Sequence, residues 1–344
     1  MIRIVLADDS ATARMNLRAI VERSGDIQVV AEAVNGLDAV DKVEAYRPDL
    51  VVMDVHMPGM DGLEATKQIM ARIPTPIIIV SAVRPEDVDH SLSATEAGAL
   101  IALAKPGGPG TLDYDAAADQ LVGMVRAMSQ VMVVRRWQPK RPDPQPVPAV
   151  SPRAHAHPEL IAIAASTGGP GALRQIFGSL PASLPVPIVL VQHIAAEFTQ
   201  GFADWLSTNS RLPVRVAADG EAMRAGTIYV APGDHHLTVT PDRLARLDRS
   251  PAIGGFRPSA TRLFESAGAA FGPRLVAVIL TGMGSDGADG LLAAHMAGAF
   301  VLAQDRASSV VYGMAHEADR RGAVDLIIPL DEVAPSLIRL MGSA

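Results

Sequence analysis

The chain has 344 residues, a formal net charge of −7, no cysteine and 49% hydrophobic residues. This length predicts about two domains, and the lack of cysteine excludes disulfides and thiol catalysis. The negative charge argues against nucleic acid as a partner, and no apolar run is long enough for direct membrane insertion. The first strand pattern starts at residue 2 without a charged and apolar leader, so we expect a cytoplasmic protein.

Strand and helix patterns alternate over the first segment, residues 1–125. The apolar runs that we interpret as strands cover residues 2–6, 27–33, 50–53, 77–80 and 100–104. Helical patterns lie between them, including residues 11–23 and 37–45, and a last amphipathic stretch runs from residue 116 to about residue 134. Such alternation predicts a parallel sheet covered by helices on both faces.

Polar residues follow several of these strands. Asp8 and Asp9 follow the first strand, Asp54 follows the third, and Ser81 and Lys105 follow the fourth and fifth. Three carboxylates at one sheet edge repel each other unless a cation binds, and hard oxygen ligands suit Mg²⁺. A lysine and a serine opposite them can neutralise and hydrogen-bond a phosphoryl group on the central acid.

This pattern resembles a response-regulator receiver domain over residues 1–125, with a helical extension to about residue 136. The resemblance implies a flavodoxin-like fold, phosphorylation of Asp54 by a histidine kinase, and Ser81 and Lys105 as switch residues. It implies these Mg²⁺ ligands: Asp8, Asp9, Asp54 and the backbone carbonyl of His56. Receivers usually carry an aromatic residue where this chain has Ala102, so the usual aromatic switch is absent or replaced.

The composition changes at residues 137–157, which contain six prolines together with arginine, lysine and histidine. Such a composition predicts an extended, semi-rigid linker that spans at most roughly 60 Å between two domains. His155 and His157 fit either a solvated linker or a metal-binding tract.

After the linker, three apolar runs each lead to a residue type used in catalysis. Residues 160–165 precede Ser166, residues 188–192 precede His193, and residues 275–280 precede a glycine-rich loop that ends on Asp286. Short apolar runs bounded by glycine and proline are typical of buried parallel strands. Ligands bind outside the carboxyl ends of such strands. If the three strands are neighbours, the hydroxyl, imidazole and carboxylate form a triad that makes serine a nucleophile.

Each of these residues alone also fits a structural role. The turn after Ser166 could bind phosphate or simply reverse the chain, and His193 could cap a helix or lie in the core. Asp286 could be a helix N-cap or a metal ligand. The prediction of a hydrolase therefore depends on the three residues lying together.

The segment from about residue 159 to residue 340 resembles the catalytic domain of the chemotaxis protein-glutamate methylesterases. The matching motifs are Ala-Ser-Thr-Gly-Gly-Pro at 165–170, Gln-His at 192–193, Tyr-Val-Ala-Pro-Gly at 229–233, Arg-Pro-Ser at 257–259, Leu-Thr-Gly-Met-Gly at 280–284, Asp-Gly at 286–287, Ala-Gln-Asp at 303–305 and Val-Tyr-Gly-Met at 311–314. The expected architecture is two doubly wound parallel-sheet α/β domains: a flavodoxin-like receiver and a Rossmann-like catalytic domain at residues 158–344.

The resemblance also implies residue roles. It makes Ser166 the nucleophile, His193 the general base and acid, and Asp286 the residue that orients His193. The expected oxyanion donors are the backbone N–H of Met283 and an N–H of the turn at Thr167.

Two further residues are expected to contact substrate. They are His236, for which a packing role is the alternative, and Arg257. The family often has polar residues just before the Arg-Pro-Ser motif, where this chain has Gly254, Gly255 and Phe256. The difference affects the range of acceptable receptors.

The implied reaction is hydrolysis of γ-glutamyl methyl esters on the cytoplasmic helices of methylated chemoreceptors, with release of methanol. Deamidation of particular receptor glutamines is implied as well, since both reactions pass through one acyl-enzyme, and the catalytic site needs no cofactor. One alternative is a phosphorylation-switched binding module that has lost catalysis, which the altered loop at residues 254–256 keeps open. Another is a methylesterase that acts on a non-chemotactic receptor.

Overall fold

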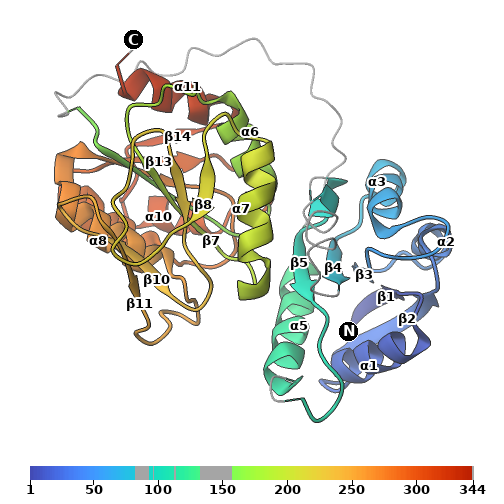
Figure 1. Cartoon of the computed structure of the whole chain (residues 1–344). Coiled ribbons are helices and arrows are strands. Elements are labelled where there is room, and N and C mark those ends of the chain that lie inside the picture. Colours follow the sequence, from blue (N-terminus) through green and yellow to red (C-terminus); the bar gives the residue numbers. More distant parts are fainter. Residues whose placement is uncertain (82–92, 96, 112–113, 132–156, 343–344) are drawn as a thin grey trace. The chain divides into compact units, whose positions relative to one another are not determined.

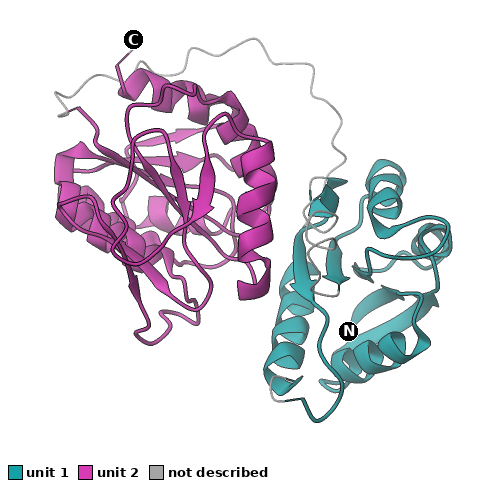
Figure 2. Cartoon of the chain, in the orientation of Figure 1, with its two compact units in different colours: residues 1–142 teal, residues 143–344 magenta. Residues whose placement is uncertain are grey.

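The computed structural model describes residues 1–81, 93–95, 97–111, 114–131 and 157–342. The chain divides into two compact units, Met1–Pro142 and Asp143–Ala344 (Figure 2). The predicted linker up to residue 156, with His155, lies outside the described residues, as does the predicted helical extension from residue 132 onward.

The first unit is built on a five-stranded parallel sheet with the order β2-β1-β3-β4-β5 (Figure 1). Its strands are β1 (Ile2–Ala7), β2 (Ile27–Ala33), β3 (Leu50–Met53), β4 (Ile77–Ser81) and β5 (Ile101–Ala104). Its helices are α1 (Ala11–Glu22), α2 (Gly36–Tyr46), α3 (Gly62–Arg72) and α5 (Tyr114–Met128). This is the predicted flavodoxin-like order, in which the switch point lies between β1 and β3.

Apolar residues of alternate strand positions hold helices on both faces of this sheet. Val5, Val51 and Ile79 belong to a buried cluster with residues of α2 and α3. Helices α1 and α5 contact each other and the sheet through other buried residues. Helix α5 ends at Met128 and not near residue 134 as predicted. The Ser129 hydroxyl donates to the carbonyl of Arg126 at 3.0 Å, a local bond that competes with helix continuation.

The second unit is built on a seven-stranded parallel sheet with the order β14-β13-β12-β6-β7-β9-β8. Its strands are β6 (Leu160–Ala165), β7 (Ile188–Gln192), β8 (Val214–Val216), β9 (Ile228–Val230), β12 (Leu275–Ile279), β13 (Phe300–Gln304) and β14 (Leu326–Ile328). Strand β6 lies between β7 and β12. The three apolar runs singled out in the sequence are therefore neighbours, which confirms the condition that the sequence left open.

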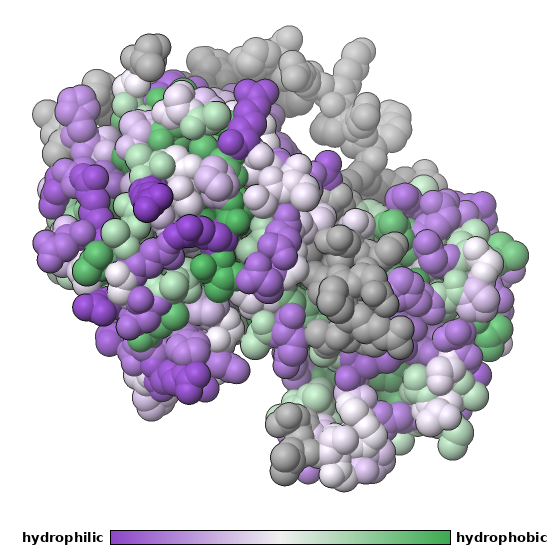
Figure 3. Space-filling model, in the orientation of Figure 1, coloured by the Kyte–Doolittle hydropathy of each residue, from purple (hydrophilic) through white to green (hydrophobic). Residues whose placement is uncertain are grey.

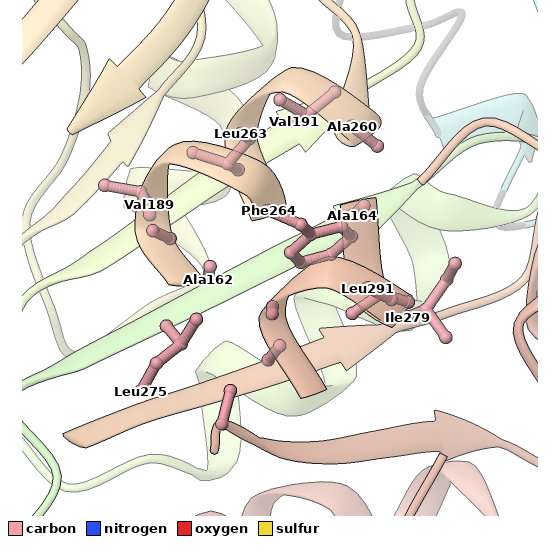
Figure 4. Close-up of a cluster of buried hydrophobic side chains, with 14 of the residues drawn as sticks. Ala162, Ala164, Val189, Val191, Ala260, Leu263, Phe264, Leu275, Ile279 and Leu291 are labelled. Carbon is pink, nitrogen blue, oxygen red and sulfur yellow. The ribbon is translucent and has the colours of Figure 1, made fainter. Parts of the chain in front are cut away.

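Helices cover both faces of this second sheet. They are α6 (Gly169–Ser179), η1 (Ala196–Phe198), α7 (Thr199–Thr208), α8 (Ala260–Phe271), η2 (Gly272–Arg274), α9 (Ala288–Met296), α10 (Met314–Arg320) and α11 (Leu330–Leu340). Residues of α8, α9 and α10 share one large buried cluster with alternate residues of β6, β7 and β12. Figure 4 shows the middle of this cluster. This cluster packs α8 against the sheet, and the N-terminus of α8 contributes to the site described below.

An antiparallel hairpin of β10 (His236–Val239) and β11 (Ala245–Asp248) stands apart from the parallel sheet. The strand–helix rhythm did not predict it. A signal was present, since the apolar residues Leu237 and Val239 alternate with polar residues on either side and between them. This alternation, followed by Pro241 and Asp242, is typical of a strand and turn.

Hydrophilic and hydrophobic residues are interspersed over the face of the described residues that Figure 3 shows. Among the described residues, no helix combines the length and the apolar character needed to cross a membrane.

Candidate functional site

The three residues predicted as a triad all follow the central strands of the second sheet. The register pairs Ala165 with Gln192, so Ser166 and His193 are the next residues on adjacent strands. The Ser166 N–H donates to the carbonyl of Thr281, just beyond β12, at 3.0 Å. The sheet order places this edge at the switch point beside the first strand, where open α/β sheets bind ligands.

The loop after β12 lies directly against Ser166. A Cβ on Gly282 would lie 2.8 Å from the Ser166 Cβ, so only glycine permits this approach. The next residue, Met283, is 38% exposed although it lies beside the buried serine. The Thr281 hydroxyl donates to the carbonyl of Thr167 at 2.8 Å. The loop therefore brings Met283 and Thr167, the two predicted oxyanion donors, to the neighbourhood of Ser166.

His193 and Asp286 form a close pair. The His193 Nε2 lies 2.8 Å from the Asp286 Oδ2, while the His193 Nδ1 is buried and has no hydrogen-bond partner among the described residues. The structure thus brings the predicted base and the predicted acid into contact, and among the described residues it shows no hydrogen bond from Ser166 to the imidazole. Nδ1 is the nitrogen left for Ser166, whereas in the chymotrypsin-type triad Nε2 serves the serine.

Asp286 also lies at the N-terminus of α8. It accepts backbone N–H bonds from Ala260 at 2.7 Å and Thr261 at 3.1 Å, and hydroxyl bonds from Ser259 at 2.8 Å and Thr261 at 2.9 Å. Burial raises the pKa of Asp286, but His193 and these donors outweigh it and lower the pKa from 3.8 to about 2. Asp286 therefore stays ionised and can orient His193.

The depressed pKa of Asp286 predicts an acid-sensitive stability. A carboxyl whose pKa falls from 3.8 to about 2 on folding stabilises the native state by about 2 kcal/mol at neutral pH. This contribution is present above the unfolded pKa and is lost as the pH falls through the folded pKa. Asp286→Asn lacks this ionisable carboxyl and therefore lacks its contribution to stability. The difference in Tm between wild type and variant should thus become smaller as the pH falls from about 5 to about 3. A difference that stays constant over this range would contradict the assignment.

Gln192 connects the backbones of the two residues at the centre of the site. Its buried side-chain amide donates to the carbonyls of Ser166 and His193, each at 2.9 Å. One side chain therefore sets the spacing of the two strand ends. In the sequence, Gln192 is recognisable only as part of a motif, because its role depends on the pairing of β6 with β7.

The first unit carries a second cluster, at the carboxyl ends of β1 and β3. Carboxylate oxygens of Asp8, Asp9 and Asp54 lie within 4.8 Å of one another. The Lys105 Nζ lies 2.7 Å from Asp54 and 2.8 Å from Asp8 as ion pairs. An all-oxygen donor set on two adjacent strand ends could hold a metal ion.

The remaining predicted residues of this pocket are close by. The backbone N–H of Lys105 donates to the carbonyl of Ser81 at 2.8 Å, and the buried Ser81 hydroxyl has no hydrogen-bond partner among the described residues. Burial and the Asp8 charge raise the pKa of Asp54 despite Lys105. Burial lowers the pKa of Lys105, but both carboxylates outweigh it and raise that pKa. The ammonium therefore stays charged beside Asp54, and His56 follows on the exposed loop after β3.

Comparison with known proteins matches both units. The family model described as CheB methylesterase matches residues 161–337, and the response regulator receiver domain matches residues 4–115. The chain belongs to the CheB methylesterase family. A protein-glutamate methylesterase/protein-glutamine glutaminase of Myxococcus xanthus is 46% identical over 98% of this chain and 96% of its own. One of Anaeromyxobacter dehalogenans is 45% identical over 98% of both chains.

A solved structure supports the membership of the second unit in the CheB methylesterase family. The catalytic domain of the Thermotoga maritima CheB methylesterase has 36% sequence identity and a TM-score of 0.52, and the match covers 54% of this chain and 100% of that chain.

The structure also shows where the two residues expected to contact substrate, His236 and Arg257, lie. His236 is fully buried. Its Nδ1 accepts from the Ser259 N–H at 3.2 Å, and its Nε2 lies 3.2 Å from the carbonyl of Pro251. Because both ring nitrogens have backbone partners, this position favours the packing alternative, and a contact of His236 with substrate stays a prediction. Arg257 is exposed, and its contact with substrate stays a prediction.

Proposed function

We propose that the protein is a phosphorylation-activated serine hydrolase that demethylates glutamate γ-methyl esters on chemoreceptors and deamidates specific receptor glutamines. The observation that carries the proposal is the buried His193–Asp286 pair, with a free imidazole Nδ1, next to Ser166 at the switch point of the sheet. The names of relatives that align over nearly the whole chain support the substrate class.

In the proposed reaction, the Ser166 Oγ attacks the γ-carbonyl carbon and its proton passes to the His193 Nδ1. The backbone N–H groups of Met283 and Thr167 stabilise the oxyanion. When the C–O or C–N bond breaks, the proton moves from His193 to the leaving methanol or ammonia. Water then attacks the acyl-enzyme, with His193 first as base and then as acid, and releases glutamate. Asp286 orients the imidazole and stabilises the imidazolium that forms when the serine proton is transferred.

The proposed control resides in a receiver domain at residues 1–125, connected by residues 137–157 to the catalytic domain at residues 158–344. A histidine kinase supplies the phosphoryl group to Asp54 in the cytoplasm. Mg²⁺, held by Asp8, Asp9, Asp54 and the His56 carbonyl, would neutralise the phosphoryl charge. Lys105 and Ser81 then bind the phosphoryl oxygens, and the catalytic site uses no cofactor.

Release of methanol from membranes that carry methylated chemoreceptors tests the proposed activity. We expect methanol from wild-type protein with Mg²⁺ and a small phosphodonor, and none from heat-denatured protein. Binding to the membranes without methanol release would instead indicate a phosphorylation-switched binding module. Methanol release only from another class of methylated receptor would indicate a non-chemotactic substrate.

Asp54→Asn should abolish activation by the phosphodonor. The amide cannot accept a phosphoryl group, so the rate of methanol release should be the same with and without phosphodonor and Mg²⁺. Asp119→Asn is a matched control, since Asp119 is an exposed residue of α5, and it should respond as the wild type does. Activation of Asp54→Asn to the wild-type rate would show that another residue takes up the signal.

A further inference from the structure

Phe256 lies flat against the imidazole of His193. The ring centroids are 4.1 Å apart and the ring planes differ by 10°. The imidazole side chain is only 8% exposed, and Phe256 itself is partly buried. The phenyl ring therefore covers one face of the predicted catalytic base.

The chain around Phe256 is built to hold the ring in place. Ile253 and Phe256 exchange two backbone hydrogen bonds of 3.1 and 3.0 Å. The two residues between them have φ values of 58° for Gly254 and 88° for Gly255. Positive φ at both central positions is the requirement of a tight two-residue turn that glycine meets without strain. The two glycines before Phe256 thus serve to present its ring.

The same segment also donates hydrogen bonds to Asp286. Three residues after Phe256, Ser259 begins the group of donors to Asp286, which continues through Ala260 and Thr261. One continuous stretch of nine residues, 253–261, therefore contacts His193 through a ring and Asp286 through hydrogen bonds.

His193 needs such a contact because its hydrogen bonds do not fix its ring plane. Asp286 binds one edge at Nε2, and Nδ1 has no partner among the described residues. A single bond at one edge leaves rotation about the Cβ–Cγ bond weakly opposed, and χ2 of histidine is intrinsically broad. A ring stacked on the face opposes that rotation.

We propose that Phe256 is a positioning residue that keeps the His193 Nδ1 directed at Ser166. The inference rests on the proposed function and adds a residue that acts through the base. Its aromatic ring restrains the imidazole where a second hydrogen bond is lacking, and stacked rings provide a directional contact.

The test uses the full-length protein and four variants: Phe256→Ala, Phe256→Leu, Phe256→Tyr and, as the control, Met296→Ala. The first readout is the rate at which a small uncharged fluorophosphonate labels Ser166. In this reaction the Oγ–P bond forms, the P–F bond breaks, fluoride leaves, and the serine proton passes to His193. The label reports activation of the serine without receptor binding. The second readout is kcat and KM for methanol release.

Phe256→Ala should lower kcat and the labelling rate by between about 10- and 100-fold, the scale of a small misplacement of a catalytic group, with little change in KM. Phe256→Tyr should keep most of the wild-type kcat and labelling rate. Phe256→Leu should keep less of both, because leucine lacks a flat ring. Met296→Ala removes an exposed side chain at the end of α9 in the same unit, away from the segment 253–261, and should stay near wild type.

Three results would overturn the inference. They are unchanged labelling in Phe256→Ala, a loss that appears only in KM, and equal rescue by leucine and tyrosine. If Phe256→Ala does not fold, as judged by its Tm, the inference is tested by comparing the labelling rate and kcat of Phe256→Tyr with those of Phe256→Leu. If the wild type neither releases methanol nor labels Ser166, the proposed function fails and the inference falls with it.

Discussion

Ser166→Ala should lower methanol release by a factor on the order of 10⁶, because loss of a triad nucleophile removes the covalent route entirely. The replaced hydroxyl is nearly buried and lies against Gly282, so alanine fits the same space. The fold, and phosphorylation of Asp54 in the other unit, should be unaffected. The measurement is methanol release under phosphodonor, together with the Tm of each protein.

Ser179→Ala is the matched control, since Ser179 is exposed at the end of the helix that Ser166 precedes. It should keep wild-type activity. Retention of more than a few per cent of the wild-type rate by Ser166→Ala would exclude the serine mechanism.

His193→Ala should be nearly as damaging, with a loss again on the order of 10⁶. Without the imidazole, no group takes the serine proton or returns it to the leaving group. His295→Ala is a matched control, because His295 forms a similar contact of 3.2 Å with Asp325 on other elements. That variant should retain its activity.

The double variant of Ser166 and His193 should be little worse than either single variant, since the two residues act as one unit. Multiplied losses in the double variant would show that they act independently, and a mild effect of His193→Ala alone would assign the base to another group.

The sequence was sufficient for the strands of the first unit and for β6, β7 and β12 of the second. The runs before Ser166 and His193 end where β6 and β7 end, because buried parallel strands are apolar throughout and the first polar residue marks the edge. The sequence could not show that β12 lies on the other side of β6. That neighbour depends on how a distant segment packs, and it decides whether Asp286 belongs to the site.

The finer arrangement could not be derived from local patterns. The choice of Nε2 for Asp286 is set by the position of α8, whose first N–H groups bind the same carboxylate. The ring of Phe256 reaches His193 through a turn more than 60 positions along the chain. The choice between the two roles left open for His236 could not be made for the same reason, since its burial depends on the hairpin of β10 and β11.

A shared acyl-enzyme is the central claim, and partitioning with hydroxylamine tests it most directly. Hydroxylamine competes with water for the acyl-Ser166 intermediate and gives a γ-glutamyl hydroxamate in place of glutamate. A receptor segment carrying the methyl ester and one carrying glutamine at the same site should give the same ratio of hydroxamate to glutamate at each hydroxylamine concentration, after subtraction of the Ser166→Ala background. Ratios that differ between the two substrates, or hydroxamate formed equally by Ser166→Ala, would contradict a common intermediate on Ser166.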